Sequence, residues 1–370
     1  MGTKKTWYPG DAVIWLLVLM PLTTPLLLSS LSLKAASMQS PLFVYSVGLL
    51  LMAAAWIGKK DGWLGLFLGW EALALLWTPT VSAFETVEMT TLGALGIVAV
   101  RALPEDRRRL LPALLVGLGL FQVAYGIQQM LGYNVLWSGF HAIKPIYAPM
   151  GTLGNSNYFG LYLAIIAPLA PLWALPFFFV GVVLAKSNLA IVAMTCALGW
   201  QHRAQARPYY WAGFGLAGLF AIAVMRGDQW LGGTAMRADI WMRALSMMHG
   251  WSWLIGHGPG SWAGDIPNAQ LAAQHAAGLA FNQVAVSLEA HNEWLEVLYE
   301  LGLLGVALLL GWLWKHRKTL PAQYEGCWLA IFIGSWGTFG FRLAVTGIVL
   351  VALLALGTPA RTTDSQPCSP

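Results

Sequence analysis

Charged side chains are scarce in this sequence. Asp, Glu, Lys and Arg together make up 10% of the 370 residues, and 58% are hydrophobic. A typical soluble domain carries roughly 25% charged residues. The composition therefore argues against an ordinary soluble enzyme and indicates an integral membrane protein. The net charge of +5 does not indicate nucleic acid, because Lys and Arg in a membrane protein mainly report orientation.

Several signatures of catalytic and metal sites are also missing. The three cysteines, Cys196, Cys327 and Cys368, are too scattered to form a disulfide framework or a zinc pattern. The chain has no HExxH, GxSxG or P-loop motif, so hydrolase and nucleotide-driven functions lack support. The first predicted outer loop, SSLSLKAASMQS, contains no acid to hold a divalent cation against a phosphate. We therefore expect neither a metal nor a cofactor.

Apolar segments separated by short polar breaks predict the fold. They indicate an all-α, polytopic transmembrane bundle of about twelve spans, with ten or eleven as the alternative count. The first apolar run follows Lys4 and Lys5 as in a signal peptide, but its length and the further spans predict an uncleaved helix. The expected spans are 12–28, 41–58, 62–78, 86–102, 110–132, 155–170, 172–185, 188–200, 209–225, 291–314, 325–340 and 343–357.

The distribution of positive charge predicts how the bundle is oriented. With the amino terminus inside, most of the 21 Lys and Arg fall on the inner side, as the positive-inside rule requires. The expected parts are an N-terminal bundle (1–225), a large helical outer loop (226–290), C-terminal spans (291–358) and an inner tail (359–370).

The outer loop contains two features that point to chemistry at the surface. RADIWMRALSMMHGW, which starts at Arg237, reads as an amphipathic helix with Asp239 and Arg243 spaced for an ion pair. The Gly-rich turn LIGHGPGSW follows. Its glycines could cradle a phosphate through backbone N–H groups.

The stretch HNEWLEVLYELG, His291 to Gly302, is where this loop meets the next span. On a continuous helix His291 and Gly302 fall on one side, so a neighbouring helix could pack closely beneath the His. This is a plausible fixed site at the membrane surface. The alternative is a helix-capping His on an ordinary span.

Lys and Arg side chains on the predicted outer side are the groups that could bind a diphosphate, since the first outer loop has no acid to hold a bridging metal ion. Arg suits this role because its planar guanidinium binds phosphate oxygens in pairs. The alternative roles are binding of lipid headgroups and local salt bridges. The candidates are Lys186, Arg226, Arg237, Arg243 and Arg342.

Three stretches together resemble a known family. They are GTLGNSNYFGLYLA (Gly151–Ala164), RADIWMRAL with LIGHGPGSW, and HNEWLEVLYELGLLG (His291–Gly305). In this order they are similar to motifs of the O-antigen ligase and polymerase superfamily. These are bacterial enzymes that transfer lipid-linked glycans at the outer face of the inner membrane.

The resemblance implies roles for particular residues. His291 and Arg237 would be catalytic, in a metal-independent, inverting transfer of a glycan from undecaprenyl diphosphate. His291 would accept the proton of the acceptor hydroxyl or orient it, and Arg237 would stabilise the departing diphosphate. Many members have Ser-Arg where this chain has Ser187-Asn188, so either Lys186 supplies that charge or the phosphate contact is absent. The implied substrate-binding set is Arg226, Arg342, Lys186, Asn155, Asn157 and Asn292.

Four functions remain open from the sequence. The first is a ligase of the bacterial inner membrane, with its active site facing the periplasm and the lipid A core as acceptor. A polymerase that joins lipid-linked repeats, and a protein O-oligosaccharyltransferase, would use the same donor. The fourth is a transporter, in which the mid-span acids Glu71 and Glu300 would matter instead of His291. The expected partners are the lipid-linked donor, a glycolipid or glycan acceptor and membrane lipids.

Overall fold

The computed structural model describes residues 50–58, 60–78, 81–101, 103–133, 148–203, 229–276, 278, 290–318, 320–337 and 353. Within these ranges the chain contains twelve α-helices of assigned extent, two short 3-10 helices and no strand. The all-α prediction is confirmed for this part of the chain. Expected spans and site residues in the other ranges, including Arg226 and Arg342, lie outside the described residues.

The helices follow the predicted apolar segments closely. A helical stretch at 50–58 precedes them. In chain order they are α3 (Gly62–Ala74), α4 (Val81–Arg101), α5 (Glu105–Arg108), α6 (Leu111–Met130), α7 (Ser156–Ile166), η1 (Ala167–Leu169), α8 (Leu175–Leu184), α9 (Asn188–Gln201), α11 (Gln229–Met247), α12 (Ser252–Ile255), α13 (Trp262–Ala276), α14 (Glu293–Arg317), η3 (Ala322–Tyr324) and α15 (Glu325–Gly334).

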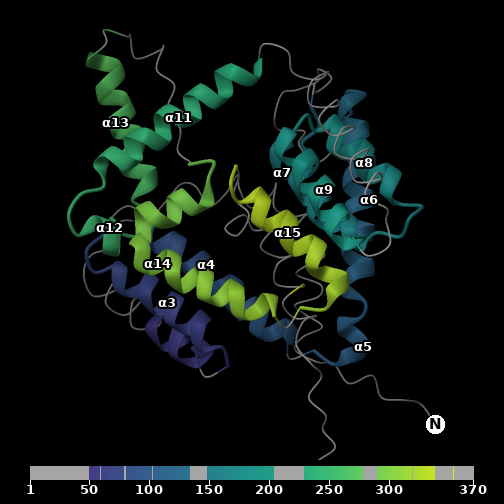
Figure 1. Cartoon of the computed structure of the whole chain (residues 1–370), viewed down its shortest axis with the longest axis horizontal. Helices are drawn as coiled ribbons and strands as arrows, with labels where there is room; N and C mark the ends of the chain where they lie inside the picture. Colours follow the sequence, from purple (N-terminus) through teal and green to yellow (C-terminus); the bar gives the residue numbers. More distant parts are fainter. Residues whose placement is uncertain are drawn as a thin grey trace, which may run out of the picture.

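The helices form two neighbouring groups (Figure 1). In the first group α14 packs along α3, and the loop helices α11, α12 and α13 contact α14. In the second group α7 and α9 pack on each other, and α6 and α8 lie against α7. Helix α15 packs on α9 and α7. A single large cluster of buried apolar side chains includes residues from both groups.

Within the described ranges, two stretches are long and apolar enough to cross a membrane. They are Glu105–Met130, which comprises α5 and α6, and Glu293–Arg317, which is α14. Helices α7 with η1, α8 and α9 are apolar but shorter, and a single crossing needs about 20 residues. Core helices of soluble proteins pass the same test of length and composition. The number of crossings stays a prediction.

Helix α14 is interrupted at Gly302, where φ is 67° and ψ is −173°. A Cβ placed there would lie 2.3 Å from the Leu254 carbonyl oxygen. The sequence correctly indicated a close approach at Gly302, but the neighbour is the end of the short helix α12 instead of another span. The argument that placed His291 and Gly302 on one face of a continuous helix is wrong, because α14 starts only at Glu293 and breaks at Gly302.

Candidate functional site

The start of α14 holds His291 in an unusual backbone conformation. The φ of His291 is 50°, in the left-handed region that non-glycine residues rarely adopt. Within the described ranges the only other non-glycine residue with positive φ is Lys186. Such residues gather at functional sites, and the sequence named both as site residues. The prediction that His291 caps α14 is wrong, because Asn292 is the capping residue.

Asn292 has a structural role that the sequence did not assign. Its side-chain oxygen accepts a hydrogen bond from the Leu295 N–H at 3.2 Å, which satisfies one of the free donors in the first helical turn. Asn292 is buried, whereas His291 is partly exposed. The cap therefore fixes the backbone directly after His291 and leaves the imidazole at the surface.

Helix α11 is attached beside His291. The Trp241 Nε1 donates a hydrogen bond to the Ala290 carbonyl oxygen at 2.7 Å. Ala290 belongs to a buried cluster with Ile240 and Tyr299. Arg237 lies one helical turn before Trp241, and residues four apart share a helix face. The structure thus brings the turn of α11 that carries Arg237 towards His291, although the two are far apart in the chain.

The C-terminal end of α15 joins the start of α14 to the second helix group. The Glu293 N–H donates to the Ser335 carbonyl oxygen at 2.9 Å, and the Trp294 ring lies 5.4 Å from that of Phe332. A Cβ placed at Gly337 would contact the Leu189 side chain at 2.9 Å. The end of α15 therefore lies between the starts of α14 and α9.

The starts of α7 and α9 lie together. Asn155 caps α7 by accepting from the Asn157 N–H at 2.8 Å, and Ser187 caps α9 by accepting from the Ala190 N–H at 3.4 Å. A Cβ placed at Gly160 would lie 3.2 Å from that of Ser187, so the two helices touch at close range here. The motif that suggested substrate binding thus also starts a helix.

These contacts gather three helix N-termini around the end of α15. The N-termini of α7, α9 and α14 each carry a partial positive charge, which favours an anionic ligand. Lys186 directly precedes the cap of α9. The Asn188 side-chain amide is buried and has no hydrogen-bond partner in the described part of the chain. Four predicted residues from distant stretches, Asn155, Asn157, Lys186 and His291, therefore lie at connected helix starts.

The Gly-rich turn has a different role from the predicted phosphate cradle. The N–H of Gly256 donates to the Ser252 oxygen at 2.9 Å, and that of Gly258 to the Glu300 oxygen at 2.7 Å. Gly256, Gly258 and Gly260 all have positive φ. A Cβ at Gly256 would lie 2.2 Å from the Glu300 oxygen. The cradle prediction is wrong for Gly256 and Gly258, because the Gly256 N–H closes the end of α12 and the Gly258 N–H binds α14 just before its break.

The same turn brings together a polar group that the sequence did not reveal. The His257 ring stacks on Tyr299 with 4.4 Å between centroids, and the Tyr299 hydroxyl donates to Asp265 at 2.9 Å. Trp262 meets the edge of the Tyr299 ring. Separate elements supply these residues, so no local motif could have indicated the group. These contacts join α13 and the Gly-rich turn to the N-terminal part of α14.

Arg243 makes a local salt bridge, and the two mid-span acids are buried. The Arg243 Nε lies 2.7 Å from the Asp239 carboxylate, so the local salt bridge is confirmed for Arg243. Glu71 and Glu300 are each 1% exposed, and both make further polar or electrostatic interactions. Among the described residues, no three His, Cys, Asp or Glu side chains are grouped so that they could hold a metal ion.

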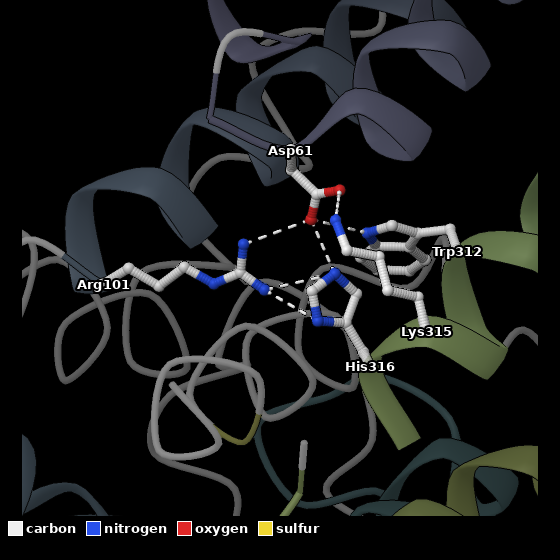
Figure 2. A network of polar contacts seen from close by, with 5 residues as sticks. All are labelled: Asp61, Arg101, Trp312, Lys315 and His316. Atoms are coloured by element: carbon white, nitrogen blue, oxygen red, sulfur yellow. Dashed lines mark hydrogen bonds and ion pairs between the residues drawn. The ribbon is translucent and has the colours of Figure 1, made fainter. Parts of the chain in front are cut away.

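At the opposite end of α14, Asp61 is the centre of a network of five side chains (Figure 2). Its carboxylate lies 3.2 Å from Arg101 Nη1, 3.0 Å from Lys315 Nζ and 2.6 Å from His316 Nε2. Trp312 Nε1 donates to it at 3.3 Å. Asp61 is 1% exposed. The network fastens α3 and α4 to the last turns of α14.

The surroundings of Asp61 favour its charged form. Burial raises the pKa of the Asp61 carboxyl, but the hydrogen bonds and charges of His316 and Lys315 outweigh it, so the pKa lies well below its ordinary value. No sequence motif announced this network. The only local signal is an acid next to Lys59 and Lys60 at the predicted inner surface.

No protein-family model matches this chain, and no curated protein is similar enough to match it. The family resemblance therefore rests on the sequence motifs alone.

Proposed function

We propose that this protein is a glycosyltransferase of the O-antigen ligase type in the bacterial inner membrane. It transfers a glycan from undecaprenyl diphosphate to a hydroxyl of the lipid A core at the periplasmic face. The observation that carries the proposal is the hydrogen bond between Trp241 and Ala290. It places the helix that bears Arg237 beside the loop that bears His291, and these two residues are the ones whose roles the family resemblance implies.

The reaction follows from these two groups. The bond between the anomeric carbon and the diphosphate oxygen breaks, and its electron pair leaves with undecaprenyl diphosphate. The acceptor oxygen bonds to the anomeric carbon from the opposite face, which inverts the configuration. The acceptor proton passes to the His291 imidazole, whose ring nitrogen can accept it as a general base.

Arg237 acts on the leaving group. Its guanidinium stabilises the charge that grows on the diphosphate, and it is charged at every physiological pH. The starts of α7, α9 and α14, together with Lys186, add positive potential on the same side of the fold. The buried caps Asn292 and Ser187 hold these starts in place. No metal ion takes part in the proposed step.

The decisive experiment uses proteoliposomes that contain a glycan on undecaprenyl diphosphate and a lipid A core acceptor. Products of the wild type, Arg237→Ala and Arg243→Ala are resolved by mass. Loss of one electrostatic contact to the leaving group lowers transfer about 10²- to 10³-fold, so Arg237→Ala should be nearly inactive. Arg243→Ala is the matched control on the same helix, because Arg243 already pairs with Asp239.

The products distinguish the related functions. Glycan on the core supports the ligase, whereas a ladder on the lipid carrier means a polymerase. If folded wild-type protein makes neither product, this proposal is wrong, and a protein acceptor or transport is tested next. Transfer that stops with a chelator and returns with magnesium would contradict the metal-independent mechanism.

A further inference from the structure

An apolar groove lies between α9, α14 and α15, at the end of α14 opposite to His291. We call it the Trp314 groove. Its volume is about 370 Å³, within the range of sites that bind small ligands. Its lining is mostly apolar, with two charged residues at one end. The lining residues are Trp200, Leu310, Leu313, Trp314, Arg317, Glu325, Trp328, Leu329, Ile331 and Phe332.

The groove runs along α14 from an apolar to a charged end. Leu310 and Arg317 are seven residues apart, which is about 10 Å along a helix. The walls between them are formed by leucines and by aromatic rings. Leu310 and Trp314 are exposed and would face hydrocarbon in a membrane. Trp200, Trp314 and Trp328 suit the boundary between hydrocarbon and water, where Trp is enriched.

The charged end of the groove carries an excess of positive charge. The acid in the lining, Glu325, is already bound by Arg203 at 2.9 Å and by Trp200 Nε1 at 2.6 Å. Arg317 and Lys318 lie over the Trp314 ring, at 5.7 Å and 5.3 Å from its centroid. Neither of them pairs with a carboxylate in the described part of the chain. Two cations beside an apolar groove complement an anionic headgroup with an attached acyl chain.

We propose that the Trp314 groove binds one anionic phospholipid of the inner leaflet. An acyl chain lies along Leu310 and Phe332, and the phosphate contacts Arg317 and Lys318. The predicted orientation puts these cations at the cytoplasmic surface, where anionic lipids attract Lys and Arg. The inference goes beyond glycan transfer. It needs the membrane location but does not depend on the chemistry proposed for His291.

The contribution of lipid charge to binding is tested by native mass spectrometry of the intact, delipidated protein. The probes are dioleoyl phosphatidylglycerol and dioleoyl phosphatidylcholine, which share acyl chains and differ in net charge. We expect one phosphatidylglycerol to bind with saturation and at least fivefold more tightly than phosphatidylcholine. Each charge removed, in Arg317→Gln and Lys318→Gln, should weaken phosphatidylglycerol about fivefold. Lys60→Gln, an exposed cation that does not line the groove, should leave binding unchanged.

The groove itself is tested by a pair of substitutions on α14. Leu310→Phe fills the groove and should weaken both lipids, whereas Leu303→Phe changes an exposed leucine that does not line it and should have no effect. Thermal unfolding checks that each variant is folded. Equal binding of the two lipids, or a folded Arg317→Gln/Lys318→Gln double variant that still prefers phosphatidylglycerol, overturns the proposal. Unchanged lipid binding in His291→Ala would separate this site from the transfer site.

Discussion

The two ends of α14 are built on different principles. The N-terminal end, at His291, is held by the Asn292 cap, by a hydrogen bond from the Trp241 side chain of α11 and by a backbone hydrogen bond to the end of α15. The C-terminal end is held by charged side chains that converge on Asp61 (Figure 2). The proposed function has an anion bind near His291, and hydrogen bonds that hold this region without Lys or Arg side chains leave those cations available. A buried ion network suits attachment, since its charges are already paired.

The sharpest test of this contrast compares the histidines at the two ends. His291→Ala should lower transfer about 10²- to 10⁴-fold, as loss of a general base does, with little change in stability because the side chain is partly exposed. His316→Ala should lower stability, because it opens the Asp61 network, while the protein that remains folded transfers glycan at nearly the wild-type rate. Transfer in proteoliposomes and thermal unfolding measure the two effects. Equal loss of activity in both variants, normalised to folded protein, would contradict the division of roles.

Asp61→Asn should have the next largest effect, on stability. Arg101, Lys315 and His316 lose their buried counterion, and breaking a buried ion pair by removing one partner costs about 3 kcal/mol. The control is Asp106→Asn, because Asp106 is exposed and its pair with Arg107 is long at 3.7 Å. It should change stability by less than about 0.5 kcal/mol. Chemical denaturation in detergent micelles compares the two variants.

The pH dependence of the Asp61 contribution has a definite sign. Because the pKa of Asp61 is lowered on folding, its stabilisation is fully present above the unfolded pKa of about 3.9 and is lost as the pH falls through the folded value. The stability difference between wild type and Asp61→Asn should therefore be constant from pH 7 to about pH 5 and shrink below about pH 4. A difference that instead grows on acidification would show that the carboxylate is not held in its charged form.

Gly302→Ala should cost about 2–3 kcal/mol. The backbone at Gly302 lies in a region that only glycine adopts readily, and a Cβ would press on the Leu254 oxygen. Gly117→Ala is a useful control, since α6 leaves open space around Gly117 and Ala favours a helix. Hydrogen exchange should show increased opening around the α12 turn. Unchanged protection in Gly302→Ala would mean that the break does not hold the turn.

Trp241→Phe should give the smallest of these effects. It removes the hydrogen bond to Ala290 while most of the aromatic surface stays, so the free energy of unfolding should fall by about 1 kcal/mol. Transfer should fall by less than about tenfold, because Arg237 and His291 are both still present. A fully active and equally stable Trp241→Phe would show that this bond does not position α11.

Local patterns predicted much of the helical architecture. Apolar segments indicated α6, α9 and α14 to within a few residues, because the composition of such segments is read directly from the chain. The expected span 155–170 begins at Asn155, and Asn155 caps α7. The ion pair of Asp239 and Arg243 followed from helical spacing alone.

Long-range contacts explain most of what the sequence did not reveal. Asp61 and His316 are separated by 255 residues, so nothing local joins them. The break in α14 depends on the fit between Gly302 and Leu254, although Leu-Gly-Leu is also compatible with an unbroken helix. The predicted phosphate cradle was wrong for the same reason, because the partner of Gly258 is the Glu300 carbonyl of a distant helix.

The interruption at Gly302 divides α14 into two helical segments. The segment before Gly302 is bound to α11 and α15 through Trp241 and Ser335. The segment after Gly302 is bound to α3 and α4 through Asp61. The Trp70 Nε1 donates a hydrogen bond of 3.1 Å to the Leu301 carbonyl oxygen, so the backbone next to the interruption is also held. The loop that carries His291 and the network around Asp61 are therefore attached to different elements of the fold, on either side of the interruption.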